Sequence, residues 1–246
     1  MKEKVLILGA TSAIARAIAA VFAARGAMLY LASRDLDELR RIAADLRLRY
    51  NAEVRYGPFD AEAAETHPAF LQAVVKEMPD LSGVVLAFGY LGDQQAAARD
   101  FPAAEKIIAS NFTGAASILG HCANYFEPVK RGFIIGISSV AGDRSRQSNY
   151  VYGAAKGALN IYLQGLRNRL YASGVRVITI KPGFVDTAMT YGLPGMFLVA
   201  SPQAVGERIV RALNKSADVV YLPWFWRYIM LIIRYIPEPL FKRLKL

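Results

Sequence analysis

The chain has 246 residues, of which 54% are hydrophobic and 20% are charged, and its formal net charge is +10. This length suits one α/β domain with a full core and leaves little room for a second. The composition excludes fibrous and wholly disordered proteins. The single cysteine excludes an intramolecular disulfide, so we expect a reducing compartment. The positive charge favours an acidic partner such as nucleic acid, anionic lipid or a phosphorylated substrate.

Short apolar runs alternate with helical stretches along the chain, beginning directly after Met1 to Lys4 with no secretory signal. This alternation predicts an α/β fold with a Rossmann-like, doubly wound parallel sheet in three layers. We expect this domain over residues 1–218 and an amphipathic helical tail over residues 219–246. The expected strands are Val5 to Leu8, Met28 to Ala32, Glu53 to Tyr56, Gly83 to Ala87, Phe133 to Ile137 and Arg176 to Ile180.

The first expected strand ends at a glycine and leads directly into a helix. The free N–H groups and positive dipole end of such a helix bind anions, and a dinucleotide pyrophosphate would fit there. Only one glycine stands in this turn, so the stretch also fits an ordinary turn in which Thr11 or Ser12 caps the helix. The candidate cofactor contacts here are Gly9, Thr11, Ser12, Ala13 and Ile14.

The second expected strand ends at Ser33 and Arg34, where an NAD enzyme often has an acidic side chain for the ribose 2′-hydroxyl. A guanidinium at this place can bind a 2′-phosphate, which favours NADPH over NADH. The alternative is that Arg34 lies on a surface turn. Asp60 follows the third strand and is a candidate contact to the adenine amine, or a turn-forming aspartate.

Tyr152 and Lys156 are four residues apart and therefore lie on one face of a helix. A phenol with a pKa near 10 exchanges protons poorly at neutral pH, and an adjacent cation is expected to lower that pKa. Ser139 stands at the end of a preceding strand, and Asn111 opens the sequence NFTG.

Taken together, these four residues resemble the catalytic set of the short-chain dehydrogenase/reductase family, over about residues 4 to 190. The resemblance implies hydride transfer from a nicotinamide. Tyr152 would be the general acid/base, Lys156 would hold the ribose and tune Tyr152, Ser139 would orient the carbonyl, and Asn111 would support a proton relay. Further cofactor contacts would come from Ala87, Phe88, Gly89, Pro182, Gly183, Val185 and Thr187. Ala13, Ala15 and Ala87-Phe88-Gly89 depart from the family pattern.

Within this family, the sequences from Ala87 to Asp93, from Ser138 to Arg146 and after Arg227 are similar to those of decaprenylphosphoryl-2-keto-ribose reductases. That resemblance implies reduction of a polyprenyl-phosphate keto sugar to the arabinose form for cell-envelope polysaccharide, together with a partner flavin oxidase. One alternative is reduction of another apolar ketone, of 3-oxoacyl or steroid type. The other is a non-catalytic nucleotide-binding protein docked on membranes.

Two arginines, Arg144 and Arg146, lie between Ser139 and Tyr152 in a segment expected to line the substrate mouth. Their guanidiniums could bind a substrate phosphodiester. The alternative is that they are solvated or form salt bridges between subunits.

The tail carries a net charge of +4 from Tyr221 to Leu246 among Trp, Phe, Ile and Leu. A helix from Trp224 to Ile236 would place Arg227 and Arg234 nearly in line on an otherwise apolar rod. It is too short and too basic to span a bilayer and ends before Pro237, so we expect an interfacial helix on an anionic membrane. The alternative is that the tail packs on the domain, covers the substrate pocket or fills a dimer interface.

Several other properties follow as expectations. The protein is expected at the cytoplasmic face of the cell membrane and as a homo-oligomer. Nucleic-acid binding is disfavoured, because the basic residues of the tail are interleaved with a wide apolar face. No metal is expected, because His67, His121 and Cys122 lack the spacing of a metal site or a catalytic triad.

Overall fold

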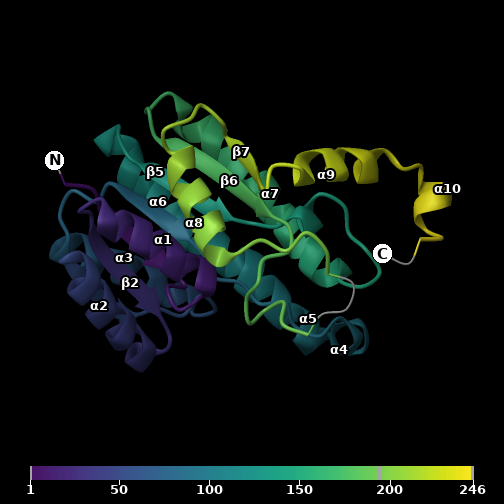
Figure 1. Ribbon diagram of the computed structural model, residues 1–246, viewed down its shortest axis with the longest axis horizontal. Coiled ribbons are helices and arrows are strands. Elements are labelled where there is room, and N and C mark those ends of the chain that lie inside the picture. The colour runs from purple at the N-terminus through teal and green to yellow at the C-terminus, as the bar shows by residue number, and fades with distance from the viewer. Residues whose placement is uncertain (1, 193–195, 245–246) are drawn as a thin grey trace.

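A computed structural model describes residues 2–192 and 196–244. Over these residues, seven parallel strands form one sheet in the order β3-β2-β1-β4-β5-β6-β7 (Figure 1). The predicted Rossmann-like, doubly wound sheet is thereby confirmed. The strands are β1 Lys4–Leu8, β2 Met28–Ser33, β3 Val54–Pro58, β4 Gly83–Leu86, β5 Phe133–Ile137, β6 Arg176–Pro182 and β7 Val219–Leu222.

Helices cover both faces of the sheet, because the strands are apolar on both sides. Their bounds are α1 Ala13–Ala24, α2 Leu36–Tyr50, α3 His67–Glu77, α4 Gln94–Arg99, α5 Phe101–Ile108, α6 Gly114–Val129, α7 Tyr150–Tyr171, α8 Pro202–Ala212, α9 Trp226–Tyr235 and α10 Glu238–Phe241. Buried residues of α1, α2 and α8 pack in one core cluster, and those of α3, α6 and α7 pack in another. The three layers follow from these two cores.

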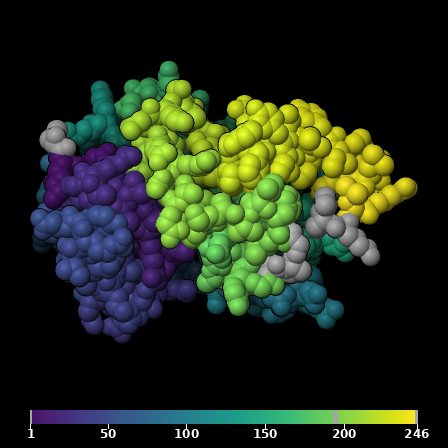
Figure 2. Space-filling model, viewed as in Figure 1, coloured from purple at the N-terminus to yellow at the C-terminus, as the bar shows by residue number. Residues whose placement is uncertain are grey.

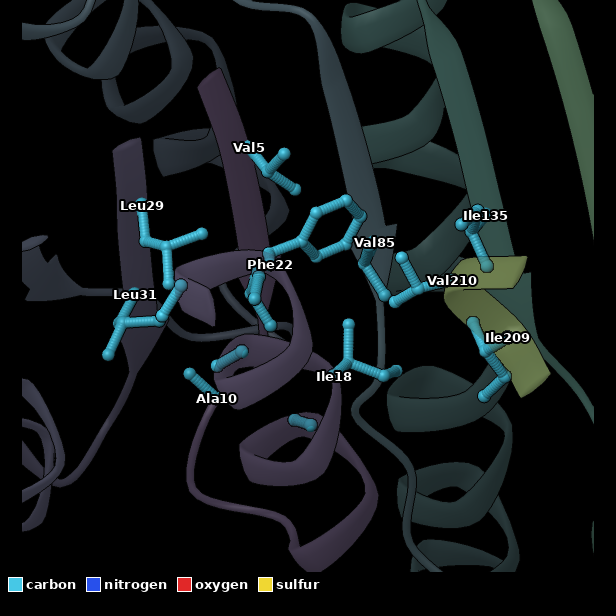
Figure 3. Close-up of a cluster of buried hydrophobic side chains, with 14 of the residues drawn as sticks. Val5, Ala10, Ile18, Phe22, Leu29, Leu31, Val85, Ile135, Ile209 and Val210 are labelled. Carbon is cyan, nitrogen blue, oxygen red and sulfur yellow. The ribbon is translucent and has the colours of Figure 1, made fainter. Parts of the chain in front are cut away.

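Figure 3 shows how α1 fits the sheet. Its Phe22 ring lies among Val5 and Val85 of the central strands and Val210 of α8. All four side chains are buried, and the Phe22 ring stacks on Phe133 with the ring centroids 6.1 Å apart. This packing fixes the N-terminal end of α1 at the carboxyl edge of β1, the edge where ligands bind in open α/β sheets.

The seventh strand corrects the expected boundary at residue 218. Val219–Leu222 pairs with β6 over Thr179 to Pro182, so the sheet domain continues through Leu222. The sequence hid this strand because it opens a long apolar run, and periodicity alone does not separate a buried strand from a buried helix. The tail therefore begins after the last strand of the sheet.

The tail is helical, close to the expected range Trp224 to Ile236. Helix α9 ends at Tyr235, and Ile236 is extended before Pro237, as expected for a residue that precedes proline. Figure 1 shows α9 and α10 projecting from one end of the sheet. None of the helices in residues 2–192 and 196–244 is both long and apolar enough to cross a membrane.

Candidate active site

The turn after β1 approaches the backbone of the segment after β4. Gly9 has φ +76°, and a side chain there would place its Cβ 2.6 Å from the Phe88 nitrogen, so only glycine fits. Ser12 caps α1 by accepting the Ala15 N–H at 3.2 Å, and its hydroxyl donates to Ala87 O at 3.3 Å. The capping alternative is therefore confirmed for Ser12. The same turn also lines the large cavity described below.

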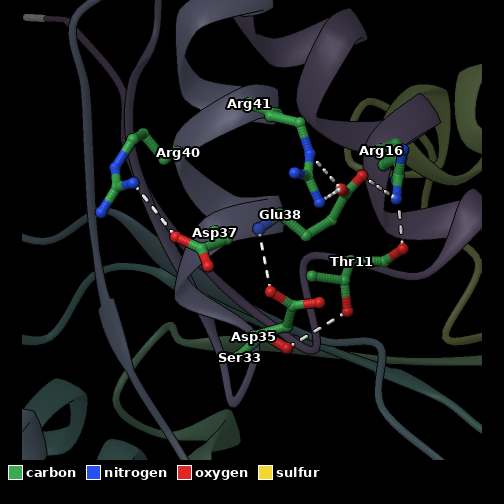
Figure 4. A network of polar contacts seen from close by, with 8 residues as sticks. All are labelled: Thr11, Arg16, Ser33, Asp35, Asp37, Glu38, Arg40 and Arg41. Carbon is green, nitrogen blue, oxygen red and sulfur yellow. Dashed lines mark hydrogen bonds and ion pairs between the residues drawn. The ribbon is translucent and has the colours of Figure 1, made fainter.

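The end of β2 has a basic character, because its neighbouring carboxylates are engaged (Figure 4). Asp35 caps α2 by accepting the Glu38 N–H at 2.9 Å, and the Glu38 carboxylate pairs with Arg16 at 2.5 Å and Arg41 at 2.6 Å. Arg34 is exposed and forms no ion pair among the described residues. Arg16, which lines the cavity, is a cation that the sequence interpretation missed, because it lies on α1 and not at a strand end.

Two other predicted cofactor contacts lie near this edge. Ser33 Oγ is 3.1 Å from Thr11 Oγ1, which joins the ends of β1 and β2. Asp60 Oδ1 accepts the Glu62 N–H at 3.0 Å, the arrangement of a turn-forming aspartate. This geometry fits the alternative that the sequence left open for Asp60.

A cavity of about 1450 Å³ lies across the carboxyl edge of the sheet. It brings together residues from the turn after β1 and from the ends of β4, β5 and β6. Of the predicted site residues, Thr11, Ser12, Ala13, Ile14, Ala87, Phe88, Gly89, Ser139, Arg144, Arg146, Tyr152, Lys156, Pro182, Gly183, Val185 and Thr187 line it. Gly9, Ser33, Arg34, Asp60 and Asn111 lie outside its lining.

Tyr152 and Lys156 face the cavity from the first turns of α7, as their spacing predicted. The Tyr152 hydroxyl lies close enough to the Ser139 side chain for Ser139 to lower the pKa of the phenol, and Lys156 Nζ lies 5.7 Å from the centroid of the Tyr152 ring. Gly142 lets the backbone after β5 lie directly against α7, since a Cβ at this position would lie 2.6 Å from the Lys156 carbonyl carbon. The segment after β5 therefore packs directly on α7, which brings Ser139 to Tyr152.

Burial dominates the acid–base character of the pair. It raises the pKa of Tyr152 to about 12, against a smaller lowering by the Ser139 hydrogen bond, and it lowers the pKa of Lys156 to about 8. The expectation that Lys156 lowers the pKa of Tyr152 is therefore not met in this structure. The physical reason is that burial removes the phenol from water and thereby disfavours its charged form.

Asn111 lies in a π-helical segment, Ala109–Thr113, between α5 and α6, a kind of helix distortion that is frequent at functional sites. Its Nδ2 donates to Tyr90 O at 2.6 Å and to Ile107 O at 2.8 Å, and its Oδ1 accepts the Tyr90 N–H at 3.2 Å. A Cβ on Gly89 would lie 2.9 Å from Asn111 Oδ1 and 3.2 Å from Lys156 Nζ. Asn111 thus fixes the backbone after β4 next to Lys156.

Arg144 and Arg146 have different surroundings in the structure. Arg144 Nη1 donates to the carbonyls of Ile233 at 2.8 Å and Ile236 at 2.6 Å, and Arg144 Nη2 pairs with Glu238 at 2.8 Å. These bonds occupy Arg144 with the tail, so its predicted role in phosphate binding is not supported. Arg146 lines the cavity half-buried, and its guanidinium has no partner among the described residues.

The tail supplies part of the cavity wall, which fits the alternative that it covers the substrate pocket. Trp226, Met230 and Ile233 of α9 line the cavity. A Cβ on Gly183 would lie 2.0 Å from Trp226 Nε1, so the glycine at this place admits the indole. The alternative that the tail packs on the domain is therefore correct for this face of α9.

Among the described residues, three buried polar atoms beside this cavity have no hydrogen-bond partner. They are Gln94 Nε2, Asn149 Oδ1 and Trp226 Nε1, which belong to residues that line the cavity. The Gln94 side chain is held by its other end, because Oε1 accepts the Val151 N–H at 3.0 Å. Buried polar groups are normally satisfied in proteins, so unpaired donors and acceptors in a cavity indicate a polar ligand.

Sequence comparison identifies the family. The profile of the short chain dehydrogenase family matches residues 3–194. The chain belongs to this family. Among similar proteins, an uncharacterized oxidoreductase of Mycobacterium tuberculosis is 36% identical over 240 residues, which cover 98% of this chain and 96% of the relative. One of Streptomyces coelicolor is 37% identical over 248 residues, with the same two coverages.

Solved structures of other proteins share the fold. An actinorhodin polyketide ketoreductase variant with NADPH has a TM-score of 0.82 at 19% identity, over 92% of this chain and 97% of that chain. An alcohol dehydrogenase of Thermococcus sibiricus complexed with 5-hydroxy-NADP has a TM-score of 0.78 at 24% identity, over 90% of this chain and 96% of that chain. At these identities the likeness establishes the arrangement of sheet and helices.

Proposed function

We propose that the protein is an NADPH-dependent ketoreductase. The observation that carries this proposal is the contact between Ser139 and Tyr152, beside Lys156, in a cavity that also includes the N-terminal turn of α1. The turn fits a dinucleotide, since Gly9 lets two backbone segments meet and α1 offers its dipole end. NADPH would supply the hydride, and two solved relatives of the same fold bind NADPH or an NADP derivative.

The residues of the chain supply the proton and orient the ketone. Ser139 and Tyr152 interact and both line the cavity, so their hydroxyls would bind one carbonyl oxygen together. With a pKa of about 12, Tyr152 stays protonated at neutral pH and can protonate the more basic alkoxide that forms. The adjacent Lys156, while charged, stabilises the phenolate that remains.

The preference for NADPH gives a first prediction. Arg34→Ser is expected to lower kcat/KM for NADPH, relative to that for NADH, by about 10- to 100-fold. The reason is that a charge-assisted hydrogen bond to the 2′-phosphate contributes about 1.5–3 kcal/mol. The measurement is kcat/KM with each cofactor. Arg25→Ser removes another exposed cation, at the end of α1, and should leave the ratio unchanged. An equal change in both variants would exclude Arg34 as the phosphate contact.

For the substrate, we propose a lipid-linked phospho keto sugar of the polyprenyl-phosphate class, with reduction of 2-keto-ribose to arabinose for the cell envelope. Three observations support it. Arg146 is a cavity cation without a partner, which suits a phosphodiester. The unpaired atoms of Gln94, Asn149 and Trp226 suit sugar hydroxyls, which donate and accept. Apolar side chains of α9 on the cavity wall suit a prenyl chain.

This substrate class implies a place for the reaction and a partner. A polyprenyl chain remains in a membrane, so the protein would act at the inner face of the cell membrane. A flavin oxidase would supply the keto group by oxidising the corresponding lipid-linked sugar. The protein would then complete the inversion at that carbon by returning a hydride to the opposite face.

Arg146 gives the second prediction. Arg146→Ala is expected to raise KM for a short-prenyl phospho keto-pentose by about 10- to 100-fold, because the loss of a charge-assisted hydrogen bond costs about 1.5–3 kcal/mol. The measurement is NADPH oxidation with the phosphorylated substrate and with the free keto-pentose. The KM for the free sugar should not change. A parallel rise for both substrates would refute phosphate recognition by this residue.

A reductase of 3-oxoacyl or steroid ketones is the second enzymatic candidate, favoured by the apolar wall from α9. It leaves the cation of Arg146 and the three unpaired polar atoms without ligands. NADPH oxidation with 3-oxoacyl thioesters and with lipid-linked keto-pentose separates the two candidates. A non-catalytic nucleotide-binding role would give no turnover with either class.

A further inference from the structure

The outer side of the tail carries a row of large apolar side chains that nothing in the described residues covers. We use the name tail face for Trp224, Tyr228, Leu231, Ile232 and Tyr235. Their exposed fractions lie between 52% and 79%. Figure 2 shows the yellow tail projecting from the body, with this segment at the surface of the molecule. Contiguous apolar residues of this kind mark an interaction site.

The geometry of α9 explains why these residues stay exposed. Successive residues of a helix are about 100° apart, so Tyr228, Leu231, Ile232 and Tyr235 lie opposite Trp226 and Met230. The latter two are buried against Val140. Helix α9 therefore has two apolar sides, one packed on the catalytic domain and one free to meet a partner.

The charges around the tail face are positive. Arg227 and Arg234 lie on one flank of α9, between the buried and the exposed apolar sides, and Lys242 and Arg243 follow α10. All four are exposed and lack ion pairs among the described residues. The nearby acid, Glu238, is paired with Arg144. A partner for this surface must therefore combine an apolar layer with negative charge.

The tail is held in place before any partner arrives. Arg144 caps the C-terminal end of α9, pairs with Glu238 and places its guanidinium 3.6 Å from the centroid of the Phe241 ring. Trp226 adds ring contacts to Phe184 and Phe197 at 5.6 and 5.4 Å. A preformed surface loses little entropy when it binds.

We propose that the tail face binds the surface of an anionic lipid bilayer. Aromatic and aliphatic side chains would enter the headgroup region while the flanking cations meet lipid phosphates, as in interfacial amphipathic helices. A second copy of the chain fits less well, because an antiparallel two-fold contact of α9 with its copy would bring the Arg227 and Arg234 flanks of both copies near each other. No helix in the described ranges is long enough to cross the bilayer.

The position of the tail face gives this contact a consequence that rests on the proposed function. Helix α9 presents Trp226, Met230 and Ile233 to the cavity while its other side would lie in the lipid surface. Exposed Phe197, Leu198 and Val199 continue the apolar surface beside the same cavity. A lipid-linked substrate would thus reach Tyr152 without its chain crossing water.

The test is flotation of the full chain with phosphatidylcholine vesicles and with vesicles that also contain phosphatidylglycerol. The unmodified protein should float with the anionic vesicles and remain largely unbound with the neutral ones. Arg227→Gln/Arg234→Gln should weaken anionic binding by about 30-fold, since each surface cation contributes about 1 kcal/mol. The matched control Arg208→Gln/Lys215→Gln removes two exposed cations from α8 and the turn after it and should float as before.

The apolar part is tested with Leu231→Ser/Ile232→Ser, which should also lose flotation. Leu48→Ser/Ile161→Ser removes exposed apolar residues from α2 and α7 and should not. Equal loss in test and control variants, or a dimer that dissociates only in the tail-face variants, would overturn the proposal. Reduction of a free keto-pentose without vesicles should be the same in all four variants. Failure of that reaction in the unmodified protein, with flotation intact, would count against the proposed function alone.

Discussion

Tyr152→Phe is expected to lower kcat for ketone reduction by about 10²- to 10⁴-fold, the usual contribution of a positioned general acid. The change removes only the hydroxyl that bonds to Ser139 and would protonate the substrate oxygen. The ring remains to pack in the cavity beside Lys156. The measurement is NADPH oxidation with a keto-pentose substrate, together with the affinity for NADPH, which should change little.

A matched control lies on the same helix. Tyr162→Phe removes a hydroxyl that donates to Ala116 O at 2.9 Å, away from the cavity. It should cost about 1 kcal/mol of stability and leave kcat as it was. Similar activity in Tyr152→Phe and Tyr162→Phe would rule out Tyr152 as the acid and, with it, the proposed reductase chemistry.

The grouping of Tyr152, Lys156 and Ser139 could be predicted from the sequence, because local geometry fixes it. Tyr152 and Lys156 share one helix face at a spacing of four, and Ser139 follows a strand that ends at the same sheet edge. The parallel sheet was equally readable from its buried apolar strands. In these cases the residues that form the sequence pattern are also the residues that make the contacts in the structure.

The remaining features depend on contacts between distant segments. Arg144 stood in the expected substrate segment, yet its donors are used by carbonyls of α9, far along the chain. The cavity wall from Trp226 and the strand Val219–Leu222 depend on the same docking of the C-terminal region. An apolar run does not reveal which of its sides meets the domain, so these features required the three-dimensional structure.

The pKa values also needed the structure. The sequence placed a lysine next to a tyrosine and thereby predicted a lowered pKa for the phenol. The sign depends instead on burial, which raises the pKa of Tyr152 to about 12 and lowers that of Lys156 to about 8. A phenol that stays protonated suits a proton donor in the direction of reduction.

The segment that carries Ser139, Arg144 and Arg146 is anchored by a buried carboxylate. Asp143 Oδ1 lies 2.5 Å from Lys181 Nζ, and Asp143 Oδ2 accepts the Tyr221 hydroxyl at 2.6 Å. The exposed fractions of the Asp143 and Lys181 side chains are 3% and 12%. Burial and this carboxylate raise the pKa of Tyr221, so its hydroxyl remains a donor. These contacts hold the segment from Ser139 to Arg146 against β6 and β7.

Asp143→Ala is therefore expected to destabilise the protein by about 3–5 kcal/mol, because it leaves the Lys181 ammonium buried without its partner. Denaturant unfolding followed by circular dichroism measures this loss. Tyr221→Phe removes one hydrogen bond and should cost only about 1 kcal/mol. The decisive comparison is Asp143→Ala/Lys181→Met, which removes both charges and should be more stable than Asp143→Ala alone. If the two changes simply add, the unpaired ammonium is not the source of the loss, and the anchor acts through packing instead.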